Sequence, residues 1–155
     1  MSVKSRLLLI IPENIKMPNK SPQIIPMLSY EDGIAAMNWL CKVFGFSETT
    51  RMLDDNGVLT HGEITLGDGV IMLASPTPDY QSPKHHRKVC EATAKYYGVP
   101  FIINGLLVCV DDVKSHYQKS KENGATILSD LEDGGPGLRY RVEDLEGHRW
   151  MFIQK

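Results

Sequence analysis

His61 and Glu63 are the side chains whose types and spacing are best suited to chemistry in this sequence. Residues two apart on an extended strand point the same way, so both side chains should share one face of a sheet. An imidazole beside a carboxylate can accept a proton from a bound molecule, and Tyr140 could donate one to a developing oxyanion. The alternative interpretation is a solvent-facing pair, or a hydrogen bond that holds two strands together.

The residues around His61 form a series of predicted elements, a βαβββ unit. A strand from Gln23 to Tyr30 precedes Asp32, which can cap a helix whose apolar positions recur at helical spacing until Gly45. Glycine-containing turns then separate short apolar runs. These runs predict three strands: Ser47 to Leu53, Val58 to Leu66 and Val70 to Ala74.

The same order of elements returns in the second half of the chain. A strand over 106–110 precedes Asp112, which can cap a helix that ends near Gly124, and strands over 125–128, 137–142 and 149–153 follow. Asp112 repeats Asp32 at an offset of 80 in the numbering, whereas Gly124 repeats Gly45 at an offset of 79. The shorter offset places Tyr140 at the position of His61. It therefore predicts that the two face each other across a pseudo-twofold axis.

Length and composition favour a single domain. The chain has 155 residues, of which 42% are hydrophobic, and this is enough for one core. We expect an N-terminal strand or tail with a linker over 1–22 and one domain over 23–154. That domain would divide into unit one at about 23–75, a connector over 76–100 and unit two at about 101–154. In the connector, Val89, Ala92 and Tyr96 predict a short helix that packs on one edge.

The charge pattern excludes some classes of partner. A formal charge of -2 without a long block of one sign argues against nucleic acid. The apolar run over 7–11 is too short for a signal peptide or a membrane span. Three cysteines, Cys41, Cys90 and Cys109, match no disulfide or zinc pattern and are expected to be reduced. We expect a cytoplasmic protein.

Both halves contain segments that resemble one known family. They are YEDGIAAMNWLCKVFGF with HGEITLGDGVIML in the first half, and VDDVKSHYQKSKENGA with LRYRVEDLEGHRWMF in the second. This ordered set resembles the vicinal oxygen chelate superfamily of glyoxalases, bleomycin-resistance proteins and extradiol dioxygenases, and within it the glyoxalase-like members of unassigned substrate. The resemblance implies an α+β fold in which two tandem βαβββ units form curved mixed sheets around a shared cleft. It also implies a homodimer across the sheet edges.

The resemblance further implies where a metal would bind. Metal-using members hold a divalent ion with His, Glu or Gln side chains on the first and last strand of each unit. Here those positions fall on Ile25, Gly105, Met72 and Met151. Since such side chains cannot hold a hard ion, we expect no metal and no cofactor. Met72 and Met151 are expected to pack in the core, or to give the cleft an apolar floor for a flat or aliphatic ligand.

Other polar residues are interpreted as structural. Arg139 and Arg141 flank Tyr140 and should point to the opposite face, where salt bridges are their expected role, although one of them could hold an anionic ligand. The turn Glu146-Gly147-His148 is expected to face water.

The leading functional hypothesis is a protein that binds a small organic molecule in the cleft between the units, without the usual metal, for sequestration or resistance. The residues expected at the ligand are His61, Glu63, Tyr140, Met72 and Met151. One alternative is a glyoxalase-type lyase or isomerase, or a dioxygenase-like enzyme, that uses His61, Glu63 and Tyr140 with a recruited ion. Another is a structural or regulatory dimer whose cleft is filled by side chains. The sequence leaves open whether any reaction is catalysed.

Overall fold

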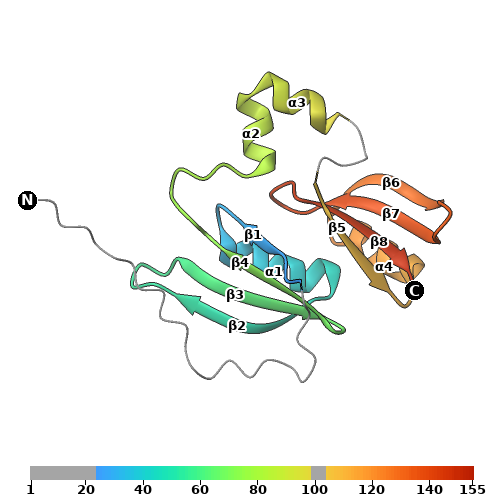
Figure 1. Cartoon of the computed structure of the whole chain (residues 1–155), viewed down its shortest axis with the longest axis horizontal. Coiled ribbons are helices and arrows are strands. Elements are labelled where there is room, and N and C mark those ends of the chain that lie inside the picture. The colour runs from blue at the N-terminus through green and yellow to red at the C-terminus, as the bar shows by residue number, and fades with distance from the viewer. Residues whose placement is uncertain (1–23, 99–103) are drawn as a thin grey trace, which may run out of the picture.

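Both predicted units are present in a computed structural model, which describes residues 24–98 and 104–155 (Figure 1). The predicted tail and linker over 1–22 lie outside the described residues. The α+β fold of two tandem βαβββ units is confirmed. Its elements are β1 (Met27–Ser29), α1 (Gly33–Phe44), β2 (Ser47–Leu53), β3 (Leu59–Leu66), β4 (Gly69–Ala74), α2 (Pro83–Val89), α3 (Glu91–Tyr97), β5 (Leu106–Val110), α4 (Val113–Glu122), β6 (Thr126–Asp133), β7 (Leu138–Glu143) and β8 (Arg149–Gln154).

Each unit forms its own four-stranded mixed sheet. The strand orders are β1-β4-β3-β2 and β5-β8-β7-β6, so the second sheet repeats the topology of the first. The first strand of each unit pairs in parallel with the last, and the other neighbours are antiparallel. Within the described residues, β1 and β5 are edge strands that pair on one side only. In this part of the chain, the two units therefore form two separate sheets.

The helices begin and end where the sequence predicts. The Asp32 side chain accepts a hydrogen bond from the backbone N–H of Ala35 at 2.9 Å, and Asp112 does the same for Ser115 at 3.0 Å. Each aspartate satisfies a donor that the first helical turn leaves open. Gly45 ends α1 with φ of 78°, a left-handed conformation that glycine adopts at little cost.

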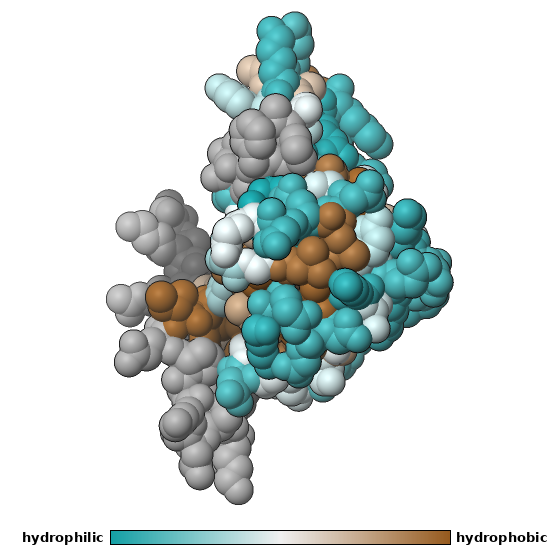
Figure 2. All heavy atoms as spheres, turned by 90° about the vertical axis from the view of Figure 1, so that its right-hand side faces the viewer, coloured by the Kyte–Doolittle hydropathy of each residue, from teal (hydrophilic) through white to brown (hydrophobic). Residues whose placement is uncertain are grey.

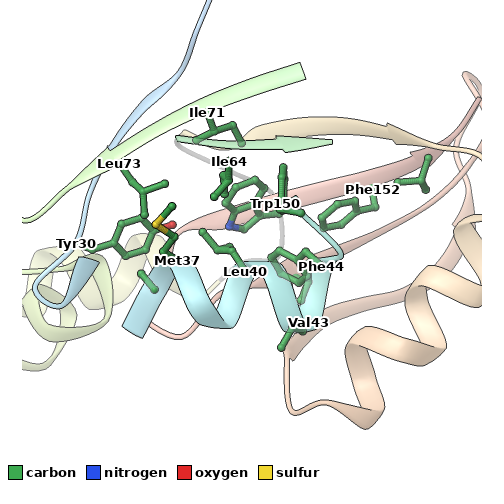
Figure 3. Close-up of a cluster of buried hydrophobic side chains, with 14 of the residues drawn as sticks. Tyr30, Met37, Leu40, Val43, Phe44, Ile64, Ile71, Leu73, Trp150 and Phe152 are labelled. Atoms are coloured by element: carbon green, nitrogen blue, oxygen red, sulfur yellow. The ribbon is translucent and has the colours of Figure 1, made fainter. Parts of the chain in front are cut away.

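One core joins the two units, because α1 packs against the first sheet, against α4 and against β8 of the second sheet. The Phe44 ring at the end of α1 lies 5.5 Å from the Trp150 ring and 4.9 Å from the Phe152 ring, between centroids (Figure 3). The largest fully buried side chains come from both units: Tyr30, Met37, Leu40, Phe44, Leu59, Ile64, Tyr140, Trp150 and Phe152.

A turn of the second unit fastens it to the first. The Glu146 carboxylate accepts hydrogen bonds from the backbone N–H groups of Glu31 and Asp32, at 2.7 and 2.9 Å. His148 Nε2 lies 2.9 Å from the Ser29 carbonyl oxygen, which can only accept, so Nε2 donates. The expectation that this turn faces water is wrong, because its polar side chains bind backbone groups of the other unit.

Asp144 lies at the centre of this junction and is almost fully buried. Its carboxylate accepts from the Tyr30 hydroxyl at 2.7 Å, from Trp150 Nε1 at 3.1 Å and from the backbone N–H of His148 at 3.0 Å. Burial raises the pKa of Asp144 and also that of Tyr30, whose hydroxyl faces this carboxylate. The buried hydroxyl and indole N–H depend on a single acceptor.

The connector helices α2 and α3 stand away from both sheets at one end of the molecule (Figure 1). The predicted apolar stripe is wrong: Val89 is 64% exposed and Tyr96 is 60% exposed. The connector is held by charge instead. Arg87 donates two hydrogen bonds to the Glu143 carboxylate, at 2.8 and 3.0 Å, and Arg149 Nη2 donates to the Tyr97 carbonyl at 2.8 Å. None of the helices in residues 24–98 and 104–155 is long and apolar enough to cross a membrane.

Candidate functional site

The face of each sheet that is turned away from its helix is its open face. In the first sheet Ile64 is fully buried in the core beneath α1, and a Cβ atom at Gly62 would lie 3.2 Å from the Met37 sulfur. Because side chains alternate along a strand, His61 and Glu63 lie on the opposite, open face.

The structure brings His61 and Glu63 together. His61 Nε2 lies 2.9 Å from Glu63 Oε1, and the His61 side chain is 29% exposed while that of Glu63 is 9% exposed. The Thr50 hydroxyl, on β2, lies 3.5 Å from the second Glu63 oxygen. The pair therefore presents an imidazole to solvent with a shielded carboxylate behind it.

A row of cross-strand neighbours extends from this pair to the edge of the first sheet. Glu63 on β3 is paired with Met72 on β4, and Met72 is paired with Met27 on β1. Met27 is 79% exposed. The first open face thus combines a polar pair with two adjacent methionines.

The second sheet has the equivalent row with the opposite charge. Arg141 on β7 is paired with Met151 on β8, and Met151 is paired with Leu107 on β5, which is 62% exposed. Arg141 thus occupies the place of Glu63, and Met151 that of Met72. Figure 2 shows the side of the molecule that carries the second unit, with apolar surface gathered at its middle and hydrophilic residues around it.

Tyr140 is not part of either open face, and the prediction that it faces His61 is wrong. It is fully buried beneath α4, where its hydroxyl lies 2.7 Å from His116 Nδ1 and 2.9 Å from the Ser120 hydroxyl. The register explains the error. Gly62 pairs with Leu73 on β4, and Tyr140 pairs with Phe152 on β8, so Tyr140 corresponds to Gly62 and not to His61. A shift of one residue moves a side chain to the other face of a sheet.

His116 is the polar residue of this buried cluster that sequence reasoning missed. Its Nε2 lies 3.0 Å from the Phe44 carbonyl oxygen at the end of α1, so it links the helices of the two units. Burial lowers the pKa of His116 and raises that of Tyr140 well above its usual range. A neutral His116 and a protonated Tyr140 can both hold hydrogen bonds inside the core, which is a structural role. The sequence offers little that could have revealed this role, because the helical spacing places His116 on one face of α4 without indicating what that face contacts.

Arg139 and Arg141 lie on the face opposite Tyr140, as their alternation with it predicts, and this is the second open face. Arg139 Nε lies 3.2 Å from Glu132 Oε1, and Arg141 Nη1 contacts the same oxygen. Arg139 Nη1 also donates to the Gly134 carbonyl oxygen at 3.0 Å. Within residues 24–98 and 104–155, the buried Nε of Arg141 has no hydrogen-bond partner. Two guanidinium groups therefore share one carboxylate.

A groove of about 1290 Å³ runs between the two units. Its lining includes residues of β1 and β5 together with Phe44, His116 and Lys119. None of the five residues predicted to bind the ligand belongs to its described lining. The cleft that the sequence predicts around these residues is therefore not this groove. Four of them, His61, Glu63, Met72 and Met151, lie on the open faces instead.

Comparison with known proteins identifies the class. The family model described as Glyoxalase/Bleomycin resistance protein/Dioxygenase superfamily matches residues 26–152, and the chain belongs to this superfamily. The resemblance seen in the sequence is confirmed.

Among curated relatives, uncharacterised proteins of Mycobacterium bovis and Mycobacterium tuberculosis are each 29% identical over 137 residues. These alignments cover 88% of this chain and 85% and 76% of the two relatives.

Three solved structures share the fold. TioX from Micromonospora sp. ML1 is 29% identical, with a TM-score of 0.63 over 86% of this chain and 96% of that one. TnmS3, described as an antibiotic binding protein from Streptomyces sp. CB03234, is 16% identical, with a TM-score of 0.61 over 88% and 98%. The bleomycin-binding protein of Streptomyces verticillus, solved with copper(II)-bleomycin, is 14% identical, with a TM-score of 0.55 over 88% and 98%.

The residues present do not fit the divalent ion that metal-using members of this superfamily hold. The register pairs Met72 with Met27 and Met151 with Leu107. The first-strand residues opposite the methionines are therefore Met27 and Leu107, two positions after the predicted Ile25 and Gly105. All four are apolar or thioether side chains, unsuited to a hard ion. The part of the chain that the structure describes holds no group of three or more His, Cys, Asp or Glu side chains placed for a metal. His61 and Glu63 supply only two donors.

Proposed function

We propose that this protein binds a small, largely flat organic molecule on its open faces and holds it without transforming it. The observation that carries the proposal is the repeated row in which an exposed apolar residue and a methionine adjoin a charged side chain. Sites for small molecules are mostly apolar, with a few polar groups that orient the ligand. The solved structures described as antibiotic-binding and bleomycin-binding proteins share this fold and support a binding role.

The burial of Tyr140 favours binding over catalysis. A reaction that moves a proton through His61 needs a second group to stabilise or protonate the product. Tyr140 was the expected donor, and it lies beneath α4 on the other face of its sheet. The enzymatic alternative therefore loses one of its three residues.

A second copy of the chain would complete the site. In the described part of each copy, β1 and β5 pair on one side only and their other edges line the groove, and exposed edges readily pair with other strands. In a twofold dimer, β1 of each copy would lie beside β5 of the partner subunit, so the dimer would contain two equivalent contacts of this kind. Met27 would then lie near Leu107 of the partner subunit, and the two open faces would join into one cleft.

We expect Met72→Glu to weaken ligand binding at least tenfold, because it places a second carboxylate beside Glu63 and removes the apolar floor. The measurement is a thermal-shift screen with planar aromatic compounds, followed by calorimetric titration of the strongest binder. Val58→Glu is the matched control, since Val58 is an exposed apolar residue that precedes β3 and is not part of the row. His61→Ala should also weaken binding while the melting temperature stays unchanged. Equal affinities for all four proteins would contradict the proposed site.

For the dimer, we expect the wild-type chain to sediment as a dimer at micromolar concentration and Leu107→Asp to shift it toward monomer. A charge at the β5 edge would be buried without a partner in the contact. Val89→Asp, which alters a similarly exposed apolar residue on the connector, should leave the dimer intact. A monomeric wild-type protein in analytical ultracentrifugation would refute this arrangement.

A further inference from the structure

We propose that Arg139 and Arg141 form an anion-binding end of the ligand site, so that the ligand is a flat organic acid. The inference rests on the proposed binding function and adds the chemical class of the ligand. The acidic group would be a carboxylate or an oxyanion of similar shape. It would lie at the Arg141 guanidinium while the apolar body of the ligand covers Met151.

The charges around the pair leave a positive surplus on the second open face. Among the described residues, Glu132 is the single carboxylate that contacts Arg139 and Arg141, and its side chain is 40% exposed. The other carboxylate on this face, Glu143, is already bound by Arg87 and Arg149. Among residues 24–98 and 104–155, these ion pairs join four guanidinium groups to two carboxylates. The surplus lies beside apolar surface, where water screens a charge less than it does in bulk.

Arg141 has an unused donor in a shielded position. Its side chain is 14% exposed, and within residues 24–98 and 104–155 its buried Nε has no partner. A buried polar group without a hydrogen bond costs free energy, so native structures rarely leave one unpaired. A guanidinium can bind a carboxylate through two parallel hydrogen bonds, which a lysine cannot. A ligand carboxylate would bind at the exposed part of the Arg141 guanidinium, and a small turn of the side chain would then bring Nε to the second carboxylate oxygen.

The position of Arg141 couples this charge to the apolar floor. Arg141 and Met151 are direct cross-strand neighbours, and adjacent strands lie about 4.8 Å apart. If the acidic group of a ligand binds at Arg141, an aromatic ring attached to that group would therefore lie over Met151 and Leu107. At the equivalent place in unit one stands Glu63, which repels an anion. The two ends of the completed cleft thus differ in charge, and the acidic end of a ligand has one preferred orientation.

The test compares 2-naphthoate with 2-naphthamide, which have the same shape but differ in charge. Calorimetric titration at pH 7 should show that the wild-type protein binds the acid at least tenfold more tightly than the amide. Arg141→Gln should reduce the affinity for the acid to that for the amide and leave the amide unchanged. Arg139→Gln should have a smaller effect in the same direction. The matched control is Arg51→Gln, since Arg51 pairs with Glu48 at the surface of unit one.

Melting curves of all variants establish that each one is folded before titration, and Arg139→Gln serves if Arg141→Gln is not. Equal wild-type affinities for acid and amide would overturn the anion site and leave the proposed binding function standing. An unchanged preference for the acid in both arginine variants would also overturn it. Binding of neither compound would count against this inference and against the proposed function together.

Discussion

Trp150→Ala is expected to lower the free energy of unfolding by about 4 kcal/mol, as large-to-small changes of fully buried aromatic residues do. Trp150 has no exposed surface and stands where the core of one unit meets that of the other. Its ring contacts Phe44 and Phe46 from the first unit and Phe152 from its own strand. Removing it opens a cavity between the units. Urea denaturation followed by far-ultraviolet circular dichroism measures the loss.

Trp39→Ala is the matched control for this change. Trp39 is only partly buried and its ring contacts Phe44, at 4.9 Å between centroids. We expect it to cost about half as much, since less apolar area leaves water when this ring packs. Unfolding of Trp150→Ala should remain a single transition, because the units share one core. A loss below about 2 kcal/mol would show that the cavity collapses or that the contact between the units is not tightly packed.

Asp144→Ala is expected to cost about 3 kcal/mol, because it leaves buried donors without an acceptor, and each such donor costs about 1–3 kcal/mol. The donors are the Tyr30 hydroxyl, Trp150 Nε1 and the backbone N–H of His148. Burial raises the pKa of Asp144, so the charged carboxylate is itself costly above the ordinary pKa of an aspartate, and its removal offsets part of this loss. The measurement is again the free energy of unfolding at pH 7.

Asp133→Ala is the control, since Asp133 is exposed at the end of β6, and its effect should stay within about 0.5 kcal/mol. Tyr30→Phe provides a second test. In the wild type it removes a buried hydrogen bond, whereas in the Asp144→Ala background it removes a hydroxyl that has already lost its acceptor. The change should therefore cost less in the variant. Additive losses would mean that Tyr30 and Asp144 do not act together.

Local features of the sequence correctly predicted the elements of each unit. Asp32 and Asp112 cap helices by accepting hydrogen bonds at their own side chains, and Gly45 ends a helix through its own φ. The contact between His61 and Glu63 follows from the two-residue period of a single strand. Such features depend on residues a few positions apart, so a single sequence is enough to predict them.

The face on which Tyr140 lies was decided by tertiary structure. Its pairing with Phe152 fixes the register of β7. Tyr140 therefore corresponds to Gly62 at an offset of 78 residues, whereas Phe152 on β8 corresponds to Leu73 at an offset of 79. A count along the chain cannot detect this change, because hydrogen bonds to a neighbouring strand set the register. Arg141 therefore stands in the place of Glu63, and the predicted pairing of His61 with Tyr140 does not occur.

By itself, then, the sequence determined the family, the two βαβββ units and the His61 and Glu63 pair. Only the tertiary structure decided that Met27 and Leu107 border the methionines, and that Asp144 joins the units. Within the described residues, it also leaves β1 and β5 paired on one side only. The physical reason is that side-chain period and capping are local, whereas burial and register depend on contacts between segments far apart in the chain, such as Tyr30 and Asp144.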